Sequence, residues 1–484
     1  MKLNNPELLL SQCLINGEWC DALSGKREAV INPATGVELA SIPLVSEEET
    51  QQAIAAAQRA QNEWKQLTAK QRSALLLAWA DKVLAAQEDL AQLMTAEQGK
   101  SLAEARGEVA YAASFITWFA EEAKRVDGAV LQAPQASQRL VVVKQPIGVC
   151  AAITPWNFPA AMITRKVAPA LAAGCAIIVK PAEQTPLTAL ALAKLAQDAG
   201  IPAGVLQVVT GEAAQVGKVL CDSPVVRKLS FTGSTEVGRI LMAQCAPSIK
   251  KLSLELGGNA PVIVFDDANL DAAVAGIMAS KFRNSGQTCV CANRIYVQDG
   301  IYERLAEKLV AAVEQLKVGD GSQEGTTQGP LIDSDAVAKV QSHIDDALIK
   351  GAQIATGGQP HALGGTFFQP TVVTGVTQKM RFAKEETFGP VAPLFRFHDE
   401  AEAIAMANDT EFGLAAYLFT QNAARQWRVP EALEYGMVGI NTGLISNEVA
   451  PFGGVKQSGL GREGSRYGIE EYLELKYLCI DVSC

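Results

Sequence analysis

Apolar side chains recur at every third or fourth position over much of the first 125 residues. The stretches 47–67 and 89–125 follow this pattern, which is typical of amphipathic helices. Between residues 126 and 145 the pattern gives way to a segment containing Gly, Pro and Gln that ends in the β-prone run RLVVVKQ. This change predicts a hairpin that leaves the main body and contacts another subunit.

From residue 147 to residue 255, short apolar runs alternate with helical stretches. The runs IGVCAAIT, CAIIVK, VLQVVTG, VRKLSFTG and KLSLELGG recur every 20 to 30 residues or so, roughly the rhythm of repeated βαβ units. We therefore expect an α/β fold with a mostly parallel, doubly wound sheet. A second set of such runs after residue 257 predicts a further α/β domain, and the final segment YLELKYLCIDVS is expected to pair with the hairpin.

Composition and charge narrow the functional classes. Hydrophobic residues make up 48% of the chain and charged residues 19%, as in soluble globular enzymes. The net charge of -10 and the scattered Lys and Arg residues disfavour nucleic acid as a partner. The apolar run from Val167 to Val179 is too short to span a bilayer, and the N-terminal stretch lacks the features of a secretory signal. We expect a cytoplasmic protein with no membrane partner.

The Cys and His residues favour neither a disulfide framework nor a metal site. Ten cysteines are irregularly spaced, which is typical of reduced thiols. His343, His361 and His398 lie beside no other His or Cys at metal-ligand spacing, so we predict no bound metal.

Two strand-to-helix turns are candidates for binding a dinucleotide. FTGSTEVG, residues 231–238, takes a strand into a helix that Ser234 or Thr235 could cap, leaving N–H groups for a phosphate. In KPAEQTP, residues 180–186, Lys180 and Glu183 could meet an adenosine ribose, although Glu183 could also be a solvated acid at a helix start. The Gly-x-Gly-x-x-Gly pattern at residues 459–464 follows no strand, and we interpret it as a flexible loop.

The loop NSGQTCVC, residues 284–291, offers two cysteines as nucleophiles. Its small polar residues favour exposure of Cys289 or Cys291, whereas Cys150, Cys175 and Cys479 lie within apolar runs that predict burial. A thiolate that attacks an aldehyde needs an oxyanion donor, a hydride acceptor and a base to activate water.

Two residues at strand ends suit those needs. Asn157 in TPWNFP is the candidate oxyanion donor, and Glu255 in LELGG is the candidate base. The alternative for Glu255 is a capped or solvated acid at the end of a strand.

These residues stand in motifs that resemble the NAD(P)-dependent aldehyde dehydrogenases over nearly the whole chain. The motifs are PWNFP, KPAEQTP, FTGSTEVG, LELGGNAP, GQTCVCANR, EETFGPV and PFGGVKQSGLGREG. The resemblance implies a Rossmann-like cofactor domain in residues 1–125 and 146–256 and a catalytic domain in 257–447. It also implies an oligomerisation arm and tail in 126–145 and 471–484, and hence a homo-oligomer, either a dimer or a tetramer.

The resemblance assigns roles to individual residues. Cys289 is the implied nucleophile, Glu255 the base that activates water, and Asn157 with the Cys289 backbone N–H the oxyanion hole. The implied cofactor residues are Pro155, Trp156, Lys180, Glu183, Gly233, Ser234, Glu386 and Phe388.

Within this family the chain is most similar to enzymes that oxidise succinate semialdehyde to succinate, with glutarate-semialdehyde enzymes close by. Arg165, Arg283 and Ser446 match positions that bind the distal carboxylate of the substrate in this branch. Taken alone, each arginine could instead snorkel or form an internal ion pair. One methylene separates the two substrates, so glutarate semialdehyde or another ω-carboxylated aldehyde is the alternative main substrate.

Glu183 and Cys291 refine this picture. Glu183 stands where some NADP-preferring members carry a small hydroxyl residue, and its charge would repel a 2'-phosphate, so we predict NAD with NADP as the alternative. Cys291 resembles the second thiol of a reversible redox switch, and a packed loop thiol is the alternative.

Two rival classes of protein are disfavoured by the residues present. Glu255 disfavours a CoA-acylating dehydrogenase, and the intact Cys289, Glu255 and Asn157 disfavour a protein that keeps the fold without the chemistry.

Overall fold

Three of four N-terminal helices form in the stretches that the apolar pattern predicts, and α2 forms between those stretches, in a computed structural model that describes residues 1–483. They are α1 (Glu47–Trp64), α2 (Ala69–Ala85), α3 (Gln87–Gln98) and α4 (Leu102–Glu122). Ser46, Thr68 and Ser101 begin α1, α2 and α4 with complete capping boxes. Gly99 ends α3 in the left-handed conformation at φ 96°, which divides the stretch 89–125 into two helices.

The first sheet has eight strands in the order β19-β11-β10-β7-β8-β9-β1-β2. Its strands are β1 (Cys13–Ile15), β2 (Glu18–Cys20), β7 (Val149–Ile153), β8 (Ile177–Lys180), β9 (Leu206–Val208), β10 (Val226–Thr232), β11 (Lys251–Glu255) and β19 (Gly459–Leu460). The strands from β11 to β9 are parallel, which confirms the doubly wound sheet expected for residues 147–255.

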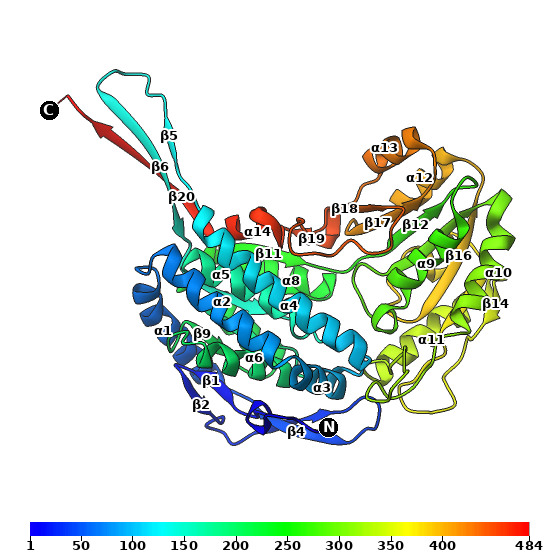
Figure 1. Cartoon of the computed structure of the whole chain (residues 1–484), viewed down its shortest axis with the longest axis horizontal. Coiled ribbons are helices and arrows are strands. Elements are labelled where there is room, and N and C mark those ends of the chain that lie inside the picture. The colour runs from blue at the N-terminus through cyan, green and yellow to red at the C-terminus, as the bar shows by residue number, and fades with distance from the viewer. Residues whose placement is uncertain (484) are drawn as a thin grey trace.

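Helices cover both faces of this sheet (Figure 1). The helices between its strands are α5 (Ala161–Ala173), α6 (Leu187–Asp198), α7 (Ala213–Asp222) and α8 (Thr235–Cys245). Residues of α1, α7 and α8 form one apolar core, and residues of α2 to α6 form the core on the other face. Parallel strands buried on both faces read as continuous apolar runs, which is why they are clearly marked in the sequence.

The second sheet has seven strands in the order β14-β15-β16-β13-β12-β17-β18, and only β14 is antiparallel to its neighbour. Its strands are β12 (Ala260–Val264), β13 (Ala292–Gln298), β14 (Gln353–Thr356), β15 (Thr371–Val376), β16 (Val391–Phe397), β17 (Ala415–Phe419) and β18 (Met437–Ile440). The helices are α9 (Leu270–Lys281), α10 (Tyr302–Val313), α11 (Ser334–Ile349), α12 (Glu400–Asn408) and α13 (Ala423–Ala432). Two separate apolar cores lie on the two faces, so the predicted second α/β unit is present.

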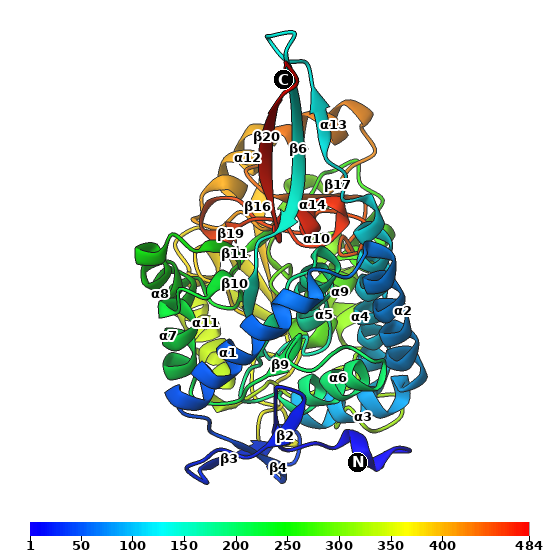
Figure 2. The same cartoon turned by 90° about the vertical axis from the view of Figure 1, so that its left-hand side faces the viewer.

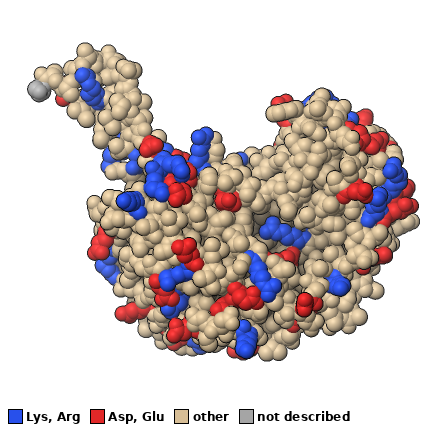
Figure 3. Space-filling model, in the orientation of Figure 1, with Lys and Arg blue, Asp and Glu red and all other residues tan. Residues whose placement is uncertain are grey.

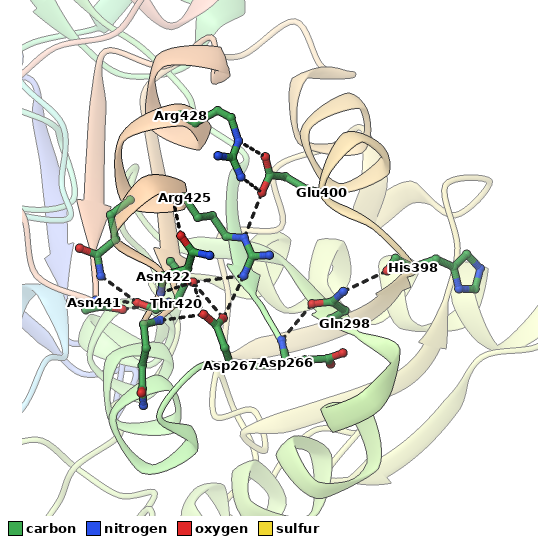
Figure 4. Close-up of polar contacts among 12 residues, drawn as sticks. Asp266, Asp267, Gln298, His398, Glu400, Thr420, Asn422, Arg425, Arg428 and Asn441 are labelled. Carbon is green, nitrogen blue, oxygen red and sulfur yellow. Dashed lines mark hydrogen bonds and ion pairs between the residues drawn. The ribbon is translucent and has the colours of Figure 1, made fainter.

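A polar cluster fastens α13 to this second sheet (Figure 4). Arg425 donates hydrogen bonds to Glu400, the first residue of α12, and to Asp267 in the loop after β12, each at 3.0 Å. Its guanidinium carbon also lies 4.1 Å from the centre of the Phe265 ring. Thr420 at the end of β17 donates to Asp267 at 2.9 Å. These contacts hold α12, α13 and the strand ends as one body.

A three-stranded arm leaves the first body (Figures 1 and 2). Its strands are β5 (Ala129–Leu131), β6 (Gln138–Pro146) and β20 (Leu473–Asp481). β20 pairs antiparallel with β6 from Leu473 opposite Pro146 to Asp481 opposite Gln138, so the expected pairing of the tail with the hairpin is confirmed. The domain boundaries and the subunit contact assigned to the arm stay predictions.

The burial expected for Cys479 is wrong, because this residue of β20 is exposed. Apolar side chains such as Val130 and Leu475 are 79% and 71% exposed on the same arm. The arm projects from the body as a thin sheet of three strands (Figures 1 and 2), and an apolar run therefore does not guarantee burial there. By contrast, Cys150 and Cys175 are buried as expected.

The remaining elements lie at the ends of the molecule. β3 (Arg27–Ile31) and β4 (Glu38–Pro43) form a small ribbon at the opposite end from the arm (Figure 2), and α14 (Ser465–Glu470) precedes β20. Acidic and basic side chains are interspersed over the face shown in Figure 3. Within residues 1–483 no helix is both long enough and apolar enough to cross a bilayer.

Candidate active site

A cavity of about 290 Å³ lies where the carboxyl ends of β7, β10 and β11 face the second sheet. One side is formed by residues 155–158, 232–234 and 255–257, and the other by Cys289, residues 386–388 and the start of α11. The cavity brings together nine of the residues proposed from the sequence, namely Pro155, Trp156, Asn157, Gly233, Ser234, Glu255, Cys289, Glu386 and Phe388. In open α/β sheets this edge is the usual place for a ligand.

A tight turn presents Cys289 to the cavity. Asn284 and Ser285 have positive φ angles of 50° and 54°, and Gly286 follows at 75°. A Cβ on Gly286 would lie 2.1 Å from the carbonyl oxygen of Gly389, so only glycine fits there. Burial, then the nearby carboxylates, raises the pKa of the Cys289 thiol to about 12. A thiol with so high a pKa is neutral at physiological pH and would need a base to act as a nucleophile.

Hydrogen bonds fix Asn157 through both its side-chain amide and its backbone carbonyl. Its Nδ2 donates to the Gln287 carbonyl oxygen at 2.9 Å, which ties it to the turn before Cys289. Its own carbonyl oxygen accepts from Lys100 Nζ at 2.8 Å and from Asn284 Nδ2 at 3.1 Å. Lys100 is buried and paired with Glu108, so Asn157 is fixed from both its amide and its backbone.

Neither Lys100 nor Glu108 stood out in the sequence, because both lie in a helical stretch far from Asn157 along the chain. Glu108 accepts hydrogen bonds from the backbone N–H groups that open α5, at 2.9 and 3.2 Å. A buried charge is stable only when it is paired and hydrogen-bonded, which this arrangement achieves. The pair therefore positions the loop PWNFP against the start of α5.

Glu255 ends β11 and is 3% exposed, with no hydrogen-bond partner for either carboxylate oxygen among the described residues. Burial, reinforced by the charge of Glu463, raises its pKa well above the usual value, although Arg165 acts in the opposite direction. A buried carboxylate with a raised pKa is suited to accept a proton.

The glycine pattern at residues 459–464 is not the flexible loop that we expected. Gly459 and Leu460 form the edge strand β19 beside β11, with Gly459 opposite Glu255. A Cβ on Gly459 would lie 1.8 Å from the Leu254 carbonyl oxygen, so this glycine allows close packing against the strand that carries Glu255.

Glu463, within the same glycine pattern, was missed by reasoning from the sequence. It pairs with Lys166, and its Oε2 lies 2.9 Å from Arg165 Nε. Burial alone would raise the pKa of Glu463, but Lys166 and Arg165 bring it below the usual value. Lys166 also donates to the Thr232 hydroxyl at 2.6 Å, which joins this cluster to the end of β10.

Two of the proposed anion-binding residues, Arg165 and Arg283, lie behind the cavity. Arg165 on α5 is 2% exposed; it has the internal ion pair with Glu463 noted above, yet its Nη2 is buried without a partner among residues 1–483. Its guanidinium carbon lies 3.9 Å from the centre of the Phe452 ring. Arg283 lies 4.8 Å from the centre of the Phe158 ring and forms no salt bridge within the described chain.

Ser446 lies in the loop after β18, and the structure does not bring its hydroxyl into hydrogen-bonding contact with either arginine. It is half-buried. Of the three residues predicted to bind the distal carboxylate, the two arginines share one feature, because each guanidinium group lies against an aromatic ring.

The dinucleotide candidates also meet at this edge. Ser234 caps α8 by accepting a hydrogen bond from the Val237 N–H, as the sequence predicted. Trp156 and Phe388 stack edge to face with ring centres 5.6 Å apart, and Phe388 has the strained φ of 56°. Glu386 accepts from the Gly258 N–H at 3.0 Å, and burial raises its pKa to about 7.

Lys180 and Glu183 lie away from Cys289 and form an ion pair with each other. Glu183 lines a second cavity of about 640 Å³, which shares Ile332 and Asp333 with the first. Glu28 and Glu212 also line it, whereas no Lys or Arg of the described chain does. An acidic cavity of this kind fits hydroxyl groups and disfavours a phosphate.

The environment of Cys291 is that of a packed loop thiol, which was the alternative to a redox switch. It is fully buried, and its Sγ donates a weak hydrogen bond to the Lys281 carbonyl oxygen at 3.4 Å. Burial raises the pKa of this thiol. Cys289 and Cys291 are both free.

Fold and site together define an α/β protein with a cleft at the carboxyl edge of a parallel sheet and a cysteine facing that cleft. The model of the aldehyde dehydrogenase family matches residues 19–478, and the chain belongs to this family. It is 65% identical over 480 residues to the succinate-semialdehyde dehydrogenase [NADP(+)] of Escherichia coli (strain K12), covering 99% of this chain and 100% of the relative. It is 64% identical over 482 residues to a glutarate-semialdehyde dehydrogenase of Pseudomonas putida, covering 100% of both chains.

A solved structure has the same fold throughout. A crystal structure described as an E. coli NADP dependent enzyme superimposes with a TM-score of 0.99 at 64% identity, covering 99% of this chain and 100% of the other. The family and the fold predicted from the sequence are thus confirmed.

Proposed function

We propose that this protein is an NAD(P)-dependent aldehyde dehydrogenase that oxidises succinate semialdehyde to succinate. Glutarate semialdehyde, which differs by one methylene, is the alternative main substrate. The observation that carries the proposal is the meeting of Cys289, Asn157 and Glu255 around one cavity, with Arg165 and Arg283 behind it. Relatives whose names give these two substrates support the assignment.

The reaction begins when Cys289 Sγ forms a bond to the aldehyde carbon while its proton goes to a base. The Asn157 amide and the Cys289 backbone N–H donate to the oxyanion of the resulting thiohemiacetal. Trp156, Glu386 and Phe388 would hold a nicotinamide, which would supply the acceptor for the hydride that leaves this carbon.

The thioester on Cys289 is then hydrolysed. Glu255 takes a proton from a water molecule, whose oxygen bonds to the carbonyl carbon, and the C–S bond breaks. The acid leaves, and the proton held by Glu255 passes to Cys289 Sγ, which restores the thiol.

Steady-state rates test the proposal directly. We expect kcat/KM for succinate semialdehyde to exceed that for butanal, an uncharged aldehyde of the same carbon number, with reduced nicotinamide and free succinate as products. Acyl-CoA formed in the presence of CoA would instead indicate a CoA-acylating dehydrogenase. Absence of any reduced nicotinamide with semialdehydes would overturn the proposal.

Replacing Arg283 with Gln should change substrate preference. Arg283 is half-buried, and a partly desolvated cation that binds a carboxylate contributes about 2 kcal/mol, so kcat/KM for succinate semialdehyde should fall roughly 30-fold. The rate with butanal should change by less than about threefold, since butanal has no anion to lose. Arg304→Gln on the surface of α10 is the matched control. An equal loss for both aldehydes would contradict the anion site.

Replacing Glu183 with Ser should shift cofactor preference towards NADP. The change removes a carboxylate beside the ribose and frees Lys180 from its ion pair, so the ratio of kcat/KM for NADP to that for NAD should rise by about tenfold or more. Glu28 and Glu212 still line the cavity and should keep the switch incomplete. Glu307→Ser, on the exposed side of α10, is the control, and an unchanged ratio would show that Glu183 does not contact the ribose.

Assembly, compartment and redox control complete the proposal. The arm built from β5, β6 and β20 carries exposed apolar side chains, which supports a homo-oligomer, a dimer or a tetramer. We place the protein in the cytoplasm.

Disulfide formation between Cys289 and Cys291 stays a hypothesis, and it requires the packed Cys291 thiol to leave its position beside Lys281.

A further inference from the structure

Tyr111 has a buried hydroxyl that the mechanism above does not use. The residue lies in α4, and its hydroxyl oxygen is shielded from solvent without a hydrogen-bond partner among residues 1–483. A buried hydroxyl is seldom left unpaired, because doing so costs free energy. Its surroundings therefore indicate which group it meets.

The Tyr111 ring packs in the same place as Arg165. It stacks edge to face on Phe115, with ring centres 4.9 Å apart and an angle of 73°. The guanidinium carbon of Arg165 lies 5.4 Å from the centre of the same Phe115 ring. Tyr111 and Arg165 thus share one aromatic neighbour, although they come from α4 and α5.

Electrostatics also place both proposed anion-binding arginines near this hydroxyl. Burial raises the pKa of Tyr111, while the positive charges of Arg165 and Arg283 act in the opposite direction. The phenol is therefore neutral at physiological pH and keeps its proton to donate. The charges of both guanidinium groups therefore act on this hydroxyl.

Among residues 1–483, two buried side chains in this region have donors without a hydrogen-bond acceptor: Tyr111 at its hydroxyl, and Arg165 at Nη2 and at Nε, the latter 2.9 Å from Glu463 Oε2 in the ion pair. A carboxylate accepts several hydrogen bonds through its two oxygens, so one anion can satisfy donors of both side chains. We propose that the Tyr111 hydroxyl donates a hydrogen bond to the distal carboxylate of the substrate, beside Arg165 and Arg283. This inference rests on the proposed function and adds a specificity residue to it.

The Tyr111→Phe variant tests the inference, because it removes one oxygen and keeps the ring on Phe115. Loss of a hydrogen bond to a charged group corresponds to a fall of about 10-fold to 100-fold in kcat/KM for succinate semialdehyde. The loss should appear mainly in KM, and the Ki of succinate as a product inhibitor should rise in parallel. Activity with butanal should stay within about twofold, since butanal lacks the carboxylate.

Tyr467→Phe, at an exposed tyrosine of α14, is the matched control, and thermal unfolding of each variant reports on stability. Equal losses for succinate semialdehyde and butanal, or no loss for either, would overturn the role of Tyr111. The wild-type enzyme separates this failure from failure of the proposed function. If wild type itself shows no preference for the carboxylated aldehyde, the anion site as a whole is wrong.

Discussion

The Cys289→Ala variant is expected to lose aldehyde oxidation by at least about 10⁴-fold, because removing a catalytic nucleophile leaves only binding and oxyanion stabilisation. No other cysteine of the described chain lines the cavity. The loss is measured by the absorbance of reduced nicotinamide with succinate semialdehyde as substrate. Binding of the nicotinamide cofactor, followed by tryptophan fluorescence, should persist.

A matched thiol control accompanies this variant. Cys479→Ala removes an exposed thiol of the arm, far from the cavity, and should leave turnover unchanged. If Cys289→Ala retained normal turnover, the thiohemiacetal mechanism would be falsified. A loss in both variants would point to damage of the fold rather than of the chemistry.

Replacing Glu255 with Gln is expected to slow thioester hydrolysis by about 10² to 10⁴-fold, because the amide keeps the shape of the side chain but cannot accept a proton. The first turnover should be less affected than later ones, which gives a burst of reduced nicotinamide followed by a slow phase. Rapid mixing with excess semialdehyde measures both phases. Glu324→Gln on the surface is the control.

The pH dependence separates the base from a structural role. Because burial raises the pKa of Glu255, its carboxylate is protonated at low pH, and the rate of thioester hydrolysis in wild type should rise as pH increases through that raised pKa. The amide side chain of the Glu255→Gln variant does not titrate, so this variant should show no such rise. A variant that keeps the wild-type pH profile would exclude Glu255 as the base.

The parallel sheets could be predicted because their strands are buried on both faces and therefore appear as continuous apolar runs. The same rule failed at Cys479, where an equally apolar run forms a strand of the thin arm. Residue pattern reports how apolar a segment is, but it does not tell whether another layer of the protein covers it. That information depends on contacts between segments far apart in the chain.

The motifs of Asn157, Glu255 and Cys289 made these residues candidates from the sequence, and the structure brings all three to one cavity. Lys100, Glu463 and Tyr111 lie in stretches whose local pattern is explained by helices or glycines, so nothing in the sequence set them apart. Each acquires its role from a partner 50 to several hundred residues away, as Lys100 does from the Asn157 carbonyl oxygen. Such partners become visible only when the fold brings them together.

The arm has a consequence for how the chain is made. β6 emerges from the ribosome more than 300 residues before β20, yet the two strands form one ladder. At a translation rate of about 5 to 20 residues per second, β6 waits roughly 15 to 65 s for its partner. β19, the edge strand next to Glu255, is likewise made long after β11, the strand with which it pairs. The arm and the edge of the first sheet therefore both form only when a late segment of the chain reaches a partner made much earlier.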